Sequence, residues 1–354
     1  MKSILFLSLL GAAVASHDLY YGNQKKALFK KTVTEYREKV LANPALLLYT
    51  SLDQEIVLPE LQIKGVVPAW LEGTLIRNSA AKFETSTQHV HHVFDGCAML
   101  HMFSFSEGTV GYANKFLKTN YYTTALETGS LGKGFSADPC KLLFANVLAY
   151  FTPKKVHYDN ANVNIAKIAD KFVALTETPL PIEFDLKTLN TRGPISFDDN
   201  LKGQVTTAHP HYDYETEESF NYLTHFGRES FYHVYSMPFK SKTRKLIASI
   251  PVKKPSYMHS FSITKQYIIL TEIPFRVNPL HLLLMNKPFI KNFVWNPQEG
   301  TIFTVVNRTT GELVGRYKGE PFFTFHHVNA FEEKDTIIVD LIAYKDPSSI
   351  DNLT

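Results

Sequence analysis

Short runs of β-branched and aromatic residues, separated by turn-forming residues, follow one another along the chain from about residue 60 onward. Runs of this length and composition predict β-strands, and polar pairs such as Gly311 with Glu312 and Lys334 with Asp335 predict the turns between them. A charged amphipathic helix is predicted over 24–42. The pattern as a whole indicates an all-β fold. The clearest strand candidates are KFVALTE (171–177), YIILTEI (267–273), TIFTVV (301–306) and TIIVDLIAY (336–344).

A weak internal repeat groups these strands into hairpins. The segments NIAKIADKFVALTE (164–177) and HSFSITKQYIILTE (259–272) share a polar opening residue, an alternating strand, a short turn, a second strand and a final Thr-Glu. Segments 209–225 and 326–340 follow the same plan, so the openings lie 45, 50 and 67 residues apart. Propeller blades have about 40–50 residues, and equivalent strands of successive blades line one central channel. We therefore expect the residues that open these hairpins to point toward a common axis.

Three of the four openings are histidines, namely His209, His259 and His326. His209, in the stretch TTAHPHYD, is by itself open to three interpretations: a metal ligand, a buried structural histidine or a surface residue. Convergence on one axis favours a shared metal site, and imidazole suits Zn, Cu, Fe and Ni. Metal-bound imidazoles need an acceptor behind them, and Glu177, at the end of the hairpin that opens at Asn164, is a candidate. The alternative for Glu177 is an exposed carboxylate at a strand end.

Composition narrows the class of protein. The 354-residue chain is 44% hydrophobic and 20% charged, which is typical of a globular protein, and its 13% aromatic content favours a β-rich fold or an aromatic-lined pocket. The net charge of +3, without a basic cluster, gives no case for nucleic acid. Two cysteines, Cys97 and Cys140, form neither a cysteine-rich zinc site nor a disulfide scaffold, and we expect both to be small buried residues.

The N-terminus has the pattern of a secretory signal over residues 1–16. Lys2 precedes an apolar run from Ile4 to Val14, which is too short to span a bilayer, and small residues follow at a predicted cleavage site. Entry into the secretory pathway is therefore expected, where Asn307 and Asn352, both in N-x-T sequons, are candidate glycosylation sites. Residues 17–59 are expected to form a helical and extended segment, followed by one β domain over 60–354.

Several motifs in order resemble the carotenoid cleavage oxygenases, the family that includes the animal β-carotene oxygenases and the retinoid isomerohydrolase of the visual cycle. The motifs that carry this resemblance are EGTLIRN (72–78), HVFDGCAMLHMFSF (92–105), DPCK (138–141), ALTET (174–178), TAHPH (207–211), YMHSFSIT (257–264), FTFHHVNAFEE (323–333) and IIVDLIAYKD (337–346).

That resemblance implies a seven-bladed β-propeller that holds Fe(2+) on its axis through four histidines, three of them backed by glutamates. It implies that His209, His259 and His326 are iron ligands and that Glu177 accepts from the ring of His259, whereas His211 and His327 are neighbours. The implied reaction is oxidative cleavage of a carotenoid or apocarotenoid double bond by O₂ to two carbonyl products.

The chain departs from the family pattern at several points. It ends 28 residues after His326, and no histidine follows His327, so the fourth ligand and the final blades are expected to be missing. The sequence RNSAAKFE (77–84) replaces a Gly-Pro-Gly, and an export signal is unusual in the animal branch. An unclosed propeller would also leave strand edges unpaired, so the isolated chain is expected to be poorly stable.

Three functions remain open from the sequence. They are a carotenoid dioxygenase, a retinoid isomerohydrolase, and a non-catalytic lipophile-binding remnant with an incomplete iron site. The apolar segment 278–295 is expected either to face a membrane at the mouth of the substrate tunnel or to pack inside the domain. His89, His91 and His92 precede a turn at Asp95, and we assign them a structural role rather than metal binding.

Overall fold

The computed structural model describes residues 34–353 except for 36–37, 41, 87, 130, 132–157 and 285–286. The signal segment, Cys140 and the DPCK motif therefore lie outside the described residues, as does most of the helix expected over 24–42. Of that helix, the described residues 34–35, 38–40 and 42 are helical.

The first sheet is antiparallel with the strand order β1-β4-β3-β2, so β2, β3 and β4 form a meander and β1 adds to the edge at β4. Its strands are β1 (Val57–Leu58), β2 (Gly73–Lys82), β3 (Cys97–Ser106) and β4 (Thr109–Phe116). Glu107 and Gly108 connect β3 to β4, and both have positive φ, as the favoured two-residue hairpin turn requires. The pairing of β1 with β4 shows that this sheet begins before residue 60, where we expected the β domain to start.

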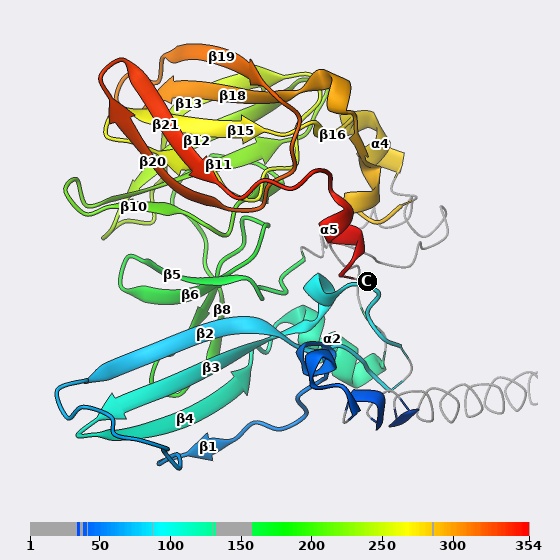
Figure 1. Cartoon of the computed structure of the whole chain (residues 1–354), viewed down its shortest axis with the longest axis vertical. Helices are drawn as coiled ribbons and strands as arrows, with labels where there is room; N and C mark the ends of the chain where they lie inside the picture. The colour runs from blue at the N-terminus through cyan, green and yellow to red at the C-terminus, as the bar shows by residue number, and fades with distance from the viewer. Residues whose placement is uncertain are drawn as a thin grey trace, which may run out of the picture.

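Three further sheets and a final strand pair follow in chain order, and all of their pairings are antiparallel. Figure 1 shows this succession from the cyan first sheet to the orange and red pair. The second sheet contains β5 (Asn164–Ile168), β6 (Lys171–Leu175), β7 (Ile182–Phe184) and β8 (Thr191–Pro194). The third contains β9 (Val205–Thr206), β10 (His211–Asp213), β11 (Glu218–His225), β12 (Ser230–Pro238) and β13 (Lys245–Val252). The fourth contains β14 (Ser262–Ile263), β15 (Tyr267–Glu272), β18 (Thr301–Asn307) and β19 (Leu313–Gly319), and the final pair is β20 (His327–Glu333) with β21 (Thr336–Leu341).

The four repeated hairpins are therefore confirmed as β5–β6, β10–β11, β14–β15 and β20–β21. The all-β class is also confirmed. Helices are short, and a small strand pair is inserted between β15 and β18. These elements are β16 (Phe275–Val277) with β17 (Phe293–Trp295), α2 (Asn120–Thr128), α4 (Pro279–Leu284), α5 (Ser348–Asp351) and the 3₁₀ turns Pro44–Tyr49, Val93–Asp95, Ile290–Asn292 and Pro297–Glu299. Among the described residues, none of the helices combines the length and the apolar character needed to cross a bilayer.

The apolar cores lie between neighbouring sheets, where the strands of one sheet pack on the next. Phe220 and Tyr232 of the third sheet share a cluster with Ile268 of the fourth, and Leu100 of the first sheet shares one with Ile182 of the second. Cys97 is buried in a further cluster, as expected, and burial raises the pKa of its thiol to about 12. This sheet-on-sheet packing positions the beginnings of the first strands of successive sheets next to one another.

The last described residues return to the first sheet. Helix α5 lies beside the turn that precedes β3, where Val93 N donates to Leu353 O at 3.0 Å and the ring of His92 contacts Ile350 O at 2.9 Å (Figure 1). Residues more than 250 positions apart are joined here by hydrogen bonds, and the one between His92 and Ile350 is buried.

Candidate metal centre

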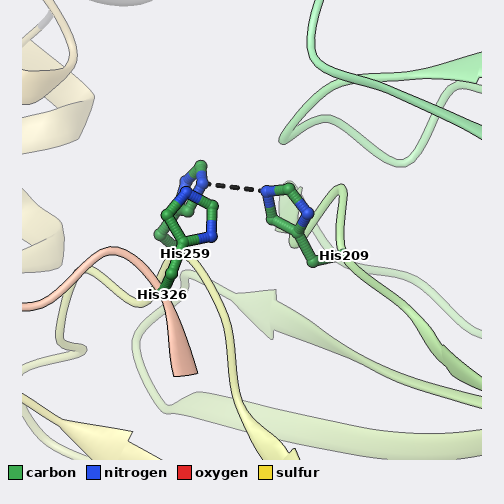
Figure 2. Close-up of side chains that lie close together, drawn as sticks. All are labelled: His209, His259 and His326. Carbon is green, nitrogen blue, oxygen red and sulfur yellow. Dashed lines mark hydrogen bonds between the residues drawn. The ribbon is translucent and has the colours of Figure 1, made fainter. Parts of the chain in front are cut away.

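The three predicted histidines lie in the loops that lead into successive sheets. His209 precedes β10 by two residues, His259 precedes β14 by three, and His326 immediately precedes β20. Their side-chain nitrogens come together, with all three ligand atoms within 4.8 Å of one another. Figure 2 shows the rings turned toward a common point, and the contact drawn there joins His209 Nε2 to His259 Nε2 at 2.9 Å.

Side-chain hydrogen bonds to the backbone tie these loops together. Asn164 Nδ2 donates to Ala208 O at 2.8 Å, which connects the second sheet to the loop of His209. Thr207 Oγ1 then donates to His259 O, and Ser260 Oγ donates to Phe325 O at 2.7 Å. Each short polar side chain thus joins one loop to the next. Asn164, the one repeat opening that is not a histidine, takes part in this connection rather than in the histidine cluster.

Burial differs among the three rings. His259 is buried, His209 is half-buried, and His326 is exposed. Burial, followed by the neighbouring rings of His259 and His326, lowers the pKa of His209 to about 3. Burial also lowers the pKa of His326. At neutral pH both imidazoles are therefore uncharged and have a lone pair available for a metal ion.

Glu177 lies behind the ring of His259, which is the partner that the family resemblance implies for this carboxylate. The His259 Nδ1–H donates to Glu177 Oε1 at 2.6 Å, and Glu177 is itself only 5% exposed. Because Nδ1 is engaged by Glu177, Nε2, which faces His209, is the nitrogen of His259 that can bind a metal ion. The interpretation of Glu177 as an exposed strand-end carboxylate is wrong.

The neighbouring histidines have other contacts. His211 Nε2 lies 2.6 Å from Phe261 O, and His327 Nδ1 lies 2.6 Å from Ser262 Oγ. His92 is buried with both ring nitrogens hydrogen-bonded to backbone groups, whereas His89 and His91 are exposed at the surface. None of these five rings belongs to the cluster of His209, His259 and His326.

The donor set fits a transition-metal ion. Two imidazole nitrogens each about 2.1 Å from one ion are about 3 Å apart when their bonds are at right angles, and His209 and His259 have this spacing. The widest separation, 4.8 Å, involves His326, and nitrogens bound to one ion are at most about 4.2 Å apart. The exposed ring of His326 has to turn inward slightly to complete the set.

Sequence reasoning missed Tyr257, Thr207 and Ser260. Tyr257 OH donates to Glu177 Oε1 at 2.9 Å, so it shares that oxygen with His259. Each of these residues lies within two positions of a predicted ligand, inside motifs that were already singled out. Their roles depend on contacts across the sheets, which the local pattern does not reveal.

Successive antiparallel sheets with a convergent histidine cluster at the strand starts define a propeller-type protein with a candidate metal centre. Residues 49–354 match the retinal pigment epithelial membrane protein family, and the chain belongs to this family. The resemblance to the carotenoid cleavage oxygenases is thereby confirmed, since the relatives include such enzymes.

Two relatives show the extent of the similarity. The human mitochondrial carotenoid-cleaving dioxygenase is 33% identical over 95% of this chain and 61% of its own length. The mouse β,β-carotene 15,15'-dioxygenase is 31% identical over 81% of this chain and 55% of its own. A solved structure of the Synechocystis apocarotenoid oxygenase superposes with a TM-score of 0.73 at 25% identity, covering 85% of this chain and 63% of that one. A cobalt-substituted form of the same enzyme gives a TM-score of 0.72. The chain thus spans between about half and two thirds of the length of these relatives.

Proposed function

We propose that the protein is an Fe(II)-dependent dioxygenase that cleaves a double bond of a carotenoid or apocarotenoid into two carbonyl products. The observation that carries this proposal is the pair formed by His209 and His259, whose Nε2 atoms face each other at 2.9 Å while Glu177 fixes the second ring from behind. Relatives named as carotenoid-cleaving enzymes support the substrate class.

The residues of the site have separable tasks in this proposal. His209, His259 and His326 would hold the iron through neutral imidazole nitrogens, and ferrous iron, when bound, supplies the redox chemistry with O₂. Glu177 keeps the proton of His259 on Nδ1 and contributes the negative charge that neutral ligands lack. Phe325 packs edge-on against the ring of His259, with 5.3 Å between centroids, and restricts water on that side.

The metal assignment is tested by iron content. Protein loaded with Fe(II) without oxygen and then desalted is expected to retain about one iron per chain, measured by mass spectrometry of the metal. His259→Ala is expected to lose nearly all of it with its strand content unchanged by circular dichroism. His211→Asn is the matched control, because it alters a neighbouring histidine that lies outside the cluster and contacts Phe261 O instead. Stoichiometric iron in His259→Ala would overturn the assignment.

The reaction is tested with the same preparation. Iron-loaded protein given β-carotene or an apocarotenal under ¹⁸O₂ is expected to yield two carbonyl products, each carrying label before exchange with water. A retinyl ester in a parallel reaction distinguishes isomerohydrolysis, which would release an alcohol without cleaving the polyene. A chain that retains little iron and changes neither substrate would instead fit the non-catalytic remnant with an incomplete iron site.

We also propose that the surface around 278–295 makes peripheral contact with a membrane. Part of the segment packs inside the domain, since Ile290 and Phe293 are buried. Another part faces outward, since Leu280 and Val294 are each 63% exposed. Lys287 is exposed in the same segment, which suits an anionic lipid surface, whereas Lys291 is paired with Asp351.

A further inference from the structure

Tyr257 is the second donor to the carboxylate that supports His259. Its hydroxyl donates to Glu177 Oε1 at 2.9 Å, and the His259 Nδ1–H donates to the same oxygen at 2.6 Å. The other oxygen, Glu177 Oε2, is buried and has no hydrogen-bond partner among the described residues. Tyr257 and His259 therefore both donate to the same oxygen of the buried carboxylate, Glu177 Oε1.

An aromatic cage fixes the position of that hydroxyl. The ring of Tyr257 is 4% exposed and lies parallel to Phe323, with 6.4 Å between centroids. Phe275 and Phe293, from the strand pair β16–β17, contact it at 6.2 and 6.0 Å. Because these rings come from separate segments, the phenol has little freedom to turn, and its oxygen is held toward Glu177.

The same cage reaches the metal ligands directly. Phe325 contacts Tyr257 at 6.5 Å and the ring of His259 at 5.3 Å, and it immediately precedes His326 in the chain. The position of the hydroxyl and the positions of two predicted ligands are thus set by one packed cluster.

A second donor changes what the carboxylate does to His259. A buried carboxylate with a single donor is a strong acceptor that draws the proton of that donor toward itself. The hydroxyl of Tyr257 gives Glu177 a second hydrogen bond, so the carboxylate draws the His259 proton less strongly. It also fixes Oε1 as the carboxylate oxygen that faces the imidazole. The imidazole of His259 is then held by its Nδ1 with Nε2 aimed at the cluster.

We propose that Tyr257 is a positioning residue of the metal centre, acting through Glu177 on the orientation and donor strength of His259. This inference rests on the proposed function, because it concerns the same metal site. It is more specific than the proposed function, because it assigns an effect on metal binding to the Tyr257 hydroxyl acting through Glu177.

The test is a double-mutant cycle read by metal affinity rather than by activity. The full chain, freed of metal, is titrated with Co(II) under nitrogen, with binding followed by calorimetry and by the visible absorption of the ion. The variants are Tyr257→Phe, Glu177→Gln and the double variant. Tyr232→Phe is the matched control, because its buried hydroxyl accepts from Ser256 N at 2.7 Å and so contacts the same segment without reaching Glu177 in a hydrogen bond.

Tyr257→Phe keeps the ring in its cage and is expected to weaken Co(II) binding about 10-fold, the lower end of the range for outer-shell partners. The double variant is expected to bind no more weakly than Glu177→Gln alone, because the hydroxyl acts only through that carboxylate. Tyr232→Phe is expected to bind Co(II) with wild-type affinity. The visible absorption of bound Co(II) is expected to shift in Tyr257→Phe and to stay unchanged in Tyr232→Phe.

Several outcomes would overturn the inference. They are wild-type affinity in Tyr257→Phe, additive losses in the double variant, or an equal loss in Tyr232→Phe. A metal-free Tyr257→Phe that fails to fold would assign the hydroxyl to stability and would also refute it. A wild-type chain that binds no Co(II) would remove the proposed function together with this inference, whereas normal wild-type binding with an unaffected Tyr257→Phe would remove this inference alone.

Discussion

Replacing His92 tests whether this buried histidine connects two distant parts of the fold or belongs to a metal cluster with His89 and His91. Its side chain is 2% exposed, Nδ1 accepts from Phe94 N at 3.1 Å, and Nε2–H donates to Ile350 O at 2.9 Å. The substitution His92→Leu preserves an apolar body of similar size and removes both hydrogen bonds.

The expected cost follows from the two backbone groups that lose their partners. Each is expected to cost about 1–2 kcal/mol, and the larger apolar side chain returns about 1 kcal/mol. The free energy of unfolding is therefore expected to fall by about 1–3 kcal/mol. His91→Leu is the matched control, because the same change at the neighbouring exposed position should stay within about 0.5 kcal/mol.

Urea denaturation at pH 7.5 measures this difference as a lower midpoint with an unchanged slope. A pH series supplies an independent check. Burial lowers the pKa of His92 below its usual 6.5, although the hydrogen bond to Ile350 acts in the opposite direction. The unfolded chain therefore takes up more protons than the folded chain as the pH falls below 6.5, and wild-type stability decreases there. In His92→Leu the free energy of unfolding should therefore depend less steeply on pH below 6.5. The slope should decrease by at most the contribution of one proton, about 1.4 kcal/mol per pH unit.

Equal stability of His92→Leu and His91→Leu, or the same pH dependence in His92→Leu and the wild type, would show that His92 does not join these two parts of the fold. Loss of bound iron in His92→Leu at wild-type stability would instead make the three histidines a metal cluster.

Three further predictions concern other parts of the chain. Arg244→Met is expected to destabilise the protein by about 3–5 kcal/mol, because it leaves a nearly buried carboxylate unpaired; Arg244 and Asp199 are 5% and 11% exposed and 2.7 Å apart. Adding Asp199→Asn should recover at least half of that loss in the same urea assay, and no recovery would contradict the pairing. Replacing Leu280 and Val294 together by Asp should reduce cosedimentation with anionic vesicles at least 5-fold, and unchanged binding would exclude this surface as the contact. If the chain enters the secretory pathway, protein made in insect cells should appear in the medium with a glycan that Asn307→Gln removes, whereas intracellular protein of unmodified mass would argue against export.

The hairpins could be predicted because their signal is local. In runs such as 267–273 and 301–306, apolar residues alternate with polar ones or stand in a row over the length of one strand. The observed strands Tyr267–Glu272 and Thr301–Asn307 have nearly the same bounds. The expectation that the histidines open each hairpin was less accurate, because they lie in the loops one to three residues before the strands. A loop position leaves each ring outside the ladder of its own sheet, where it can reach the rings of neighbouring loops.

The contacts that hold the loops together could not be predicted in the same way. Thr207 and His259 are 52 residues apart, Ser260 and Phe325 are 65 apart, and Tyr257 and Glu177 are 80 apart. A single hydroxyl group leaves no periodic pattern in a sequence, and its partner in each case is fixed only when two sheets pack. The start of the first sheet before residue 60 was missed for a related reason, since the two residues of β1 are too few to form a recognisable run.

The restraints on the three histidines are unequal, and this inequality explains how the site is built. His259 is held at Nδ1 by Glu177 and at its carbonyl by Thr207, and Phe325 packs against its ring. The loop of His209 is anchored to the same threonine, because His209 N donates to Thr207 Oγ1 at 3.0 Å. His326 has an exposed ring, and its loop is tied at the neighbouring residue, where Ser260 contacts Phe325. The centre is therefore organised around His259, because the carboxylate fixes its ring and the hydroxyls of Thr207 and Ser260 transmit its position to the loops on either side.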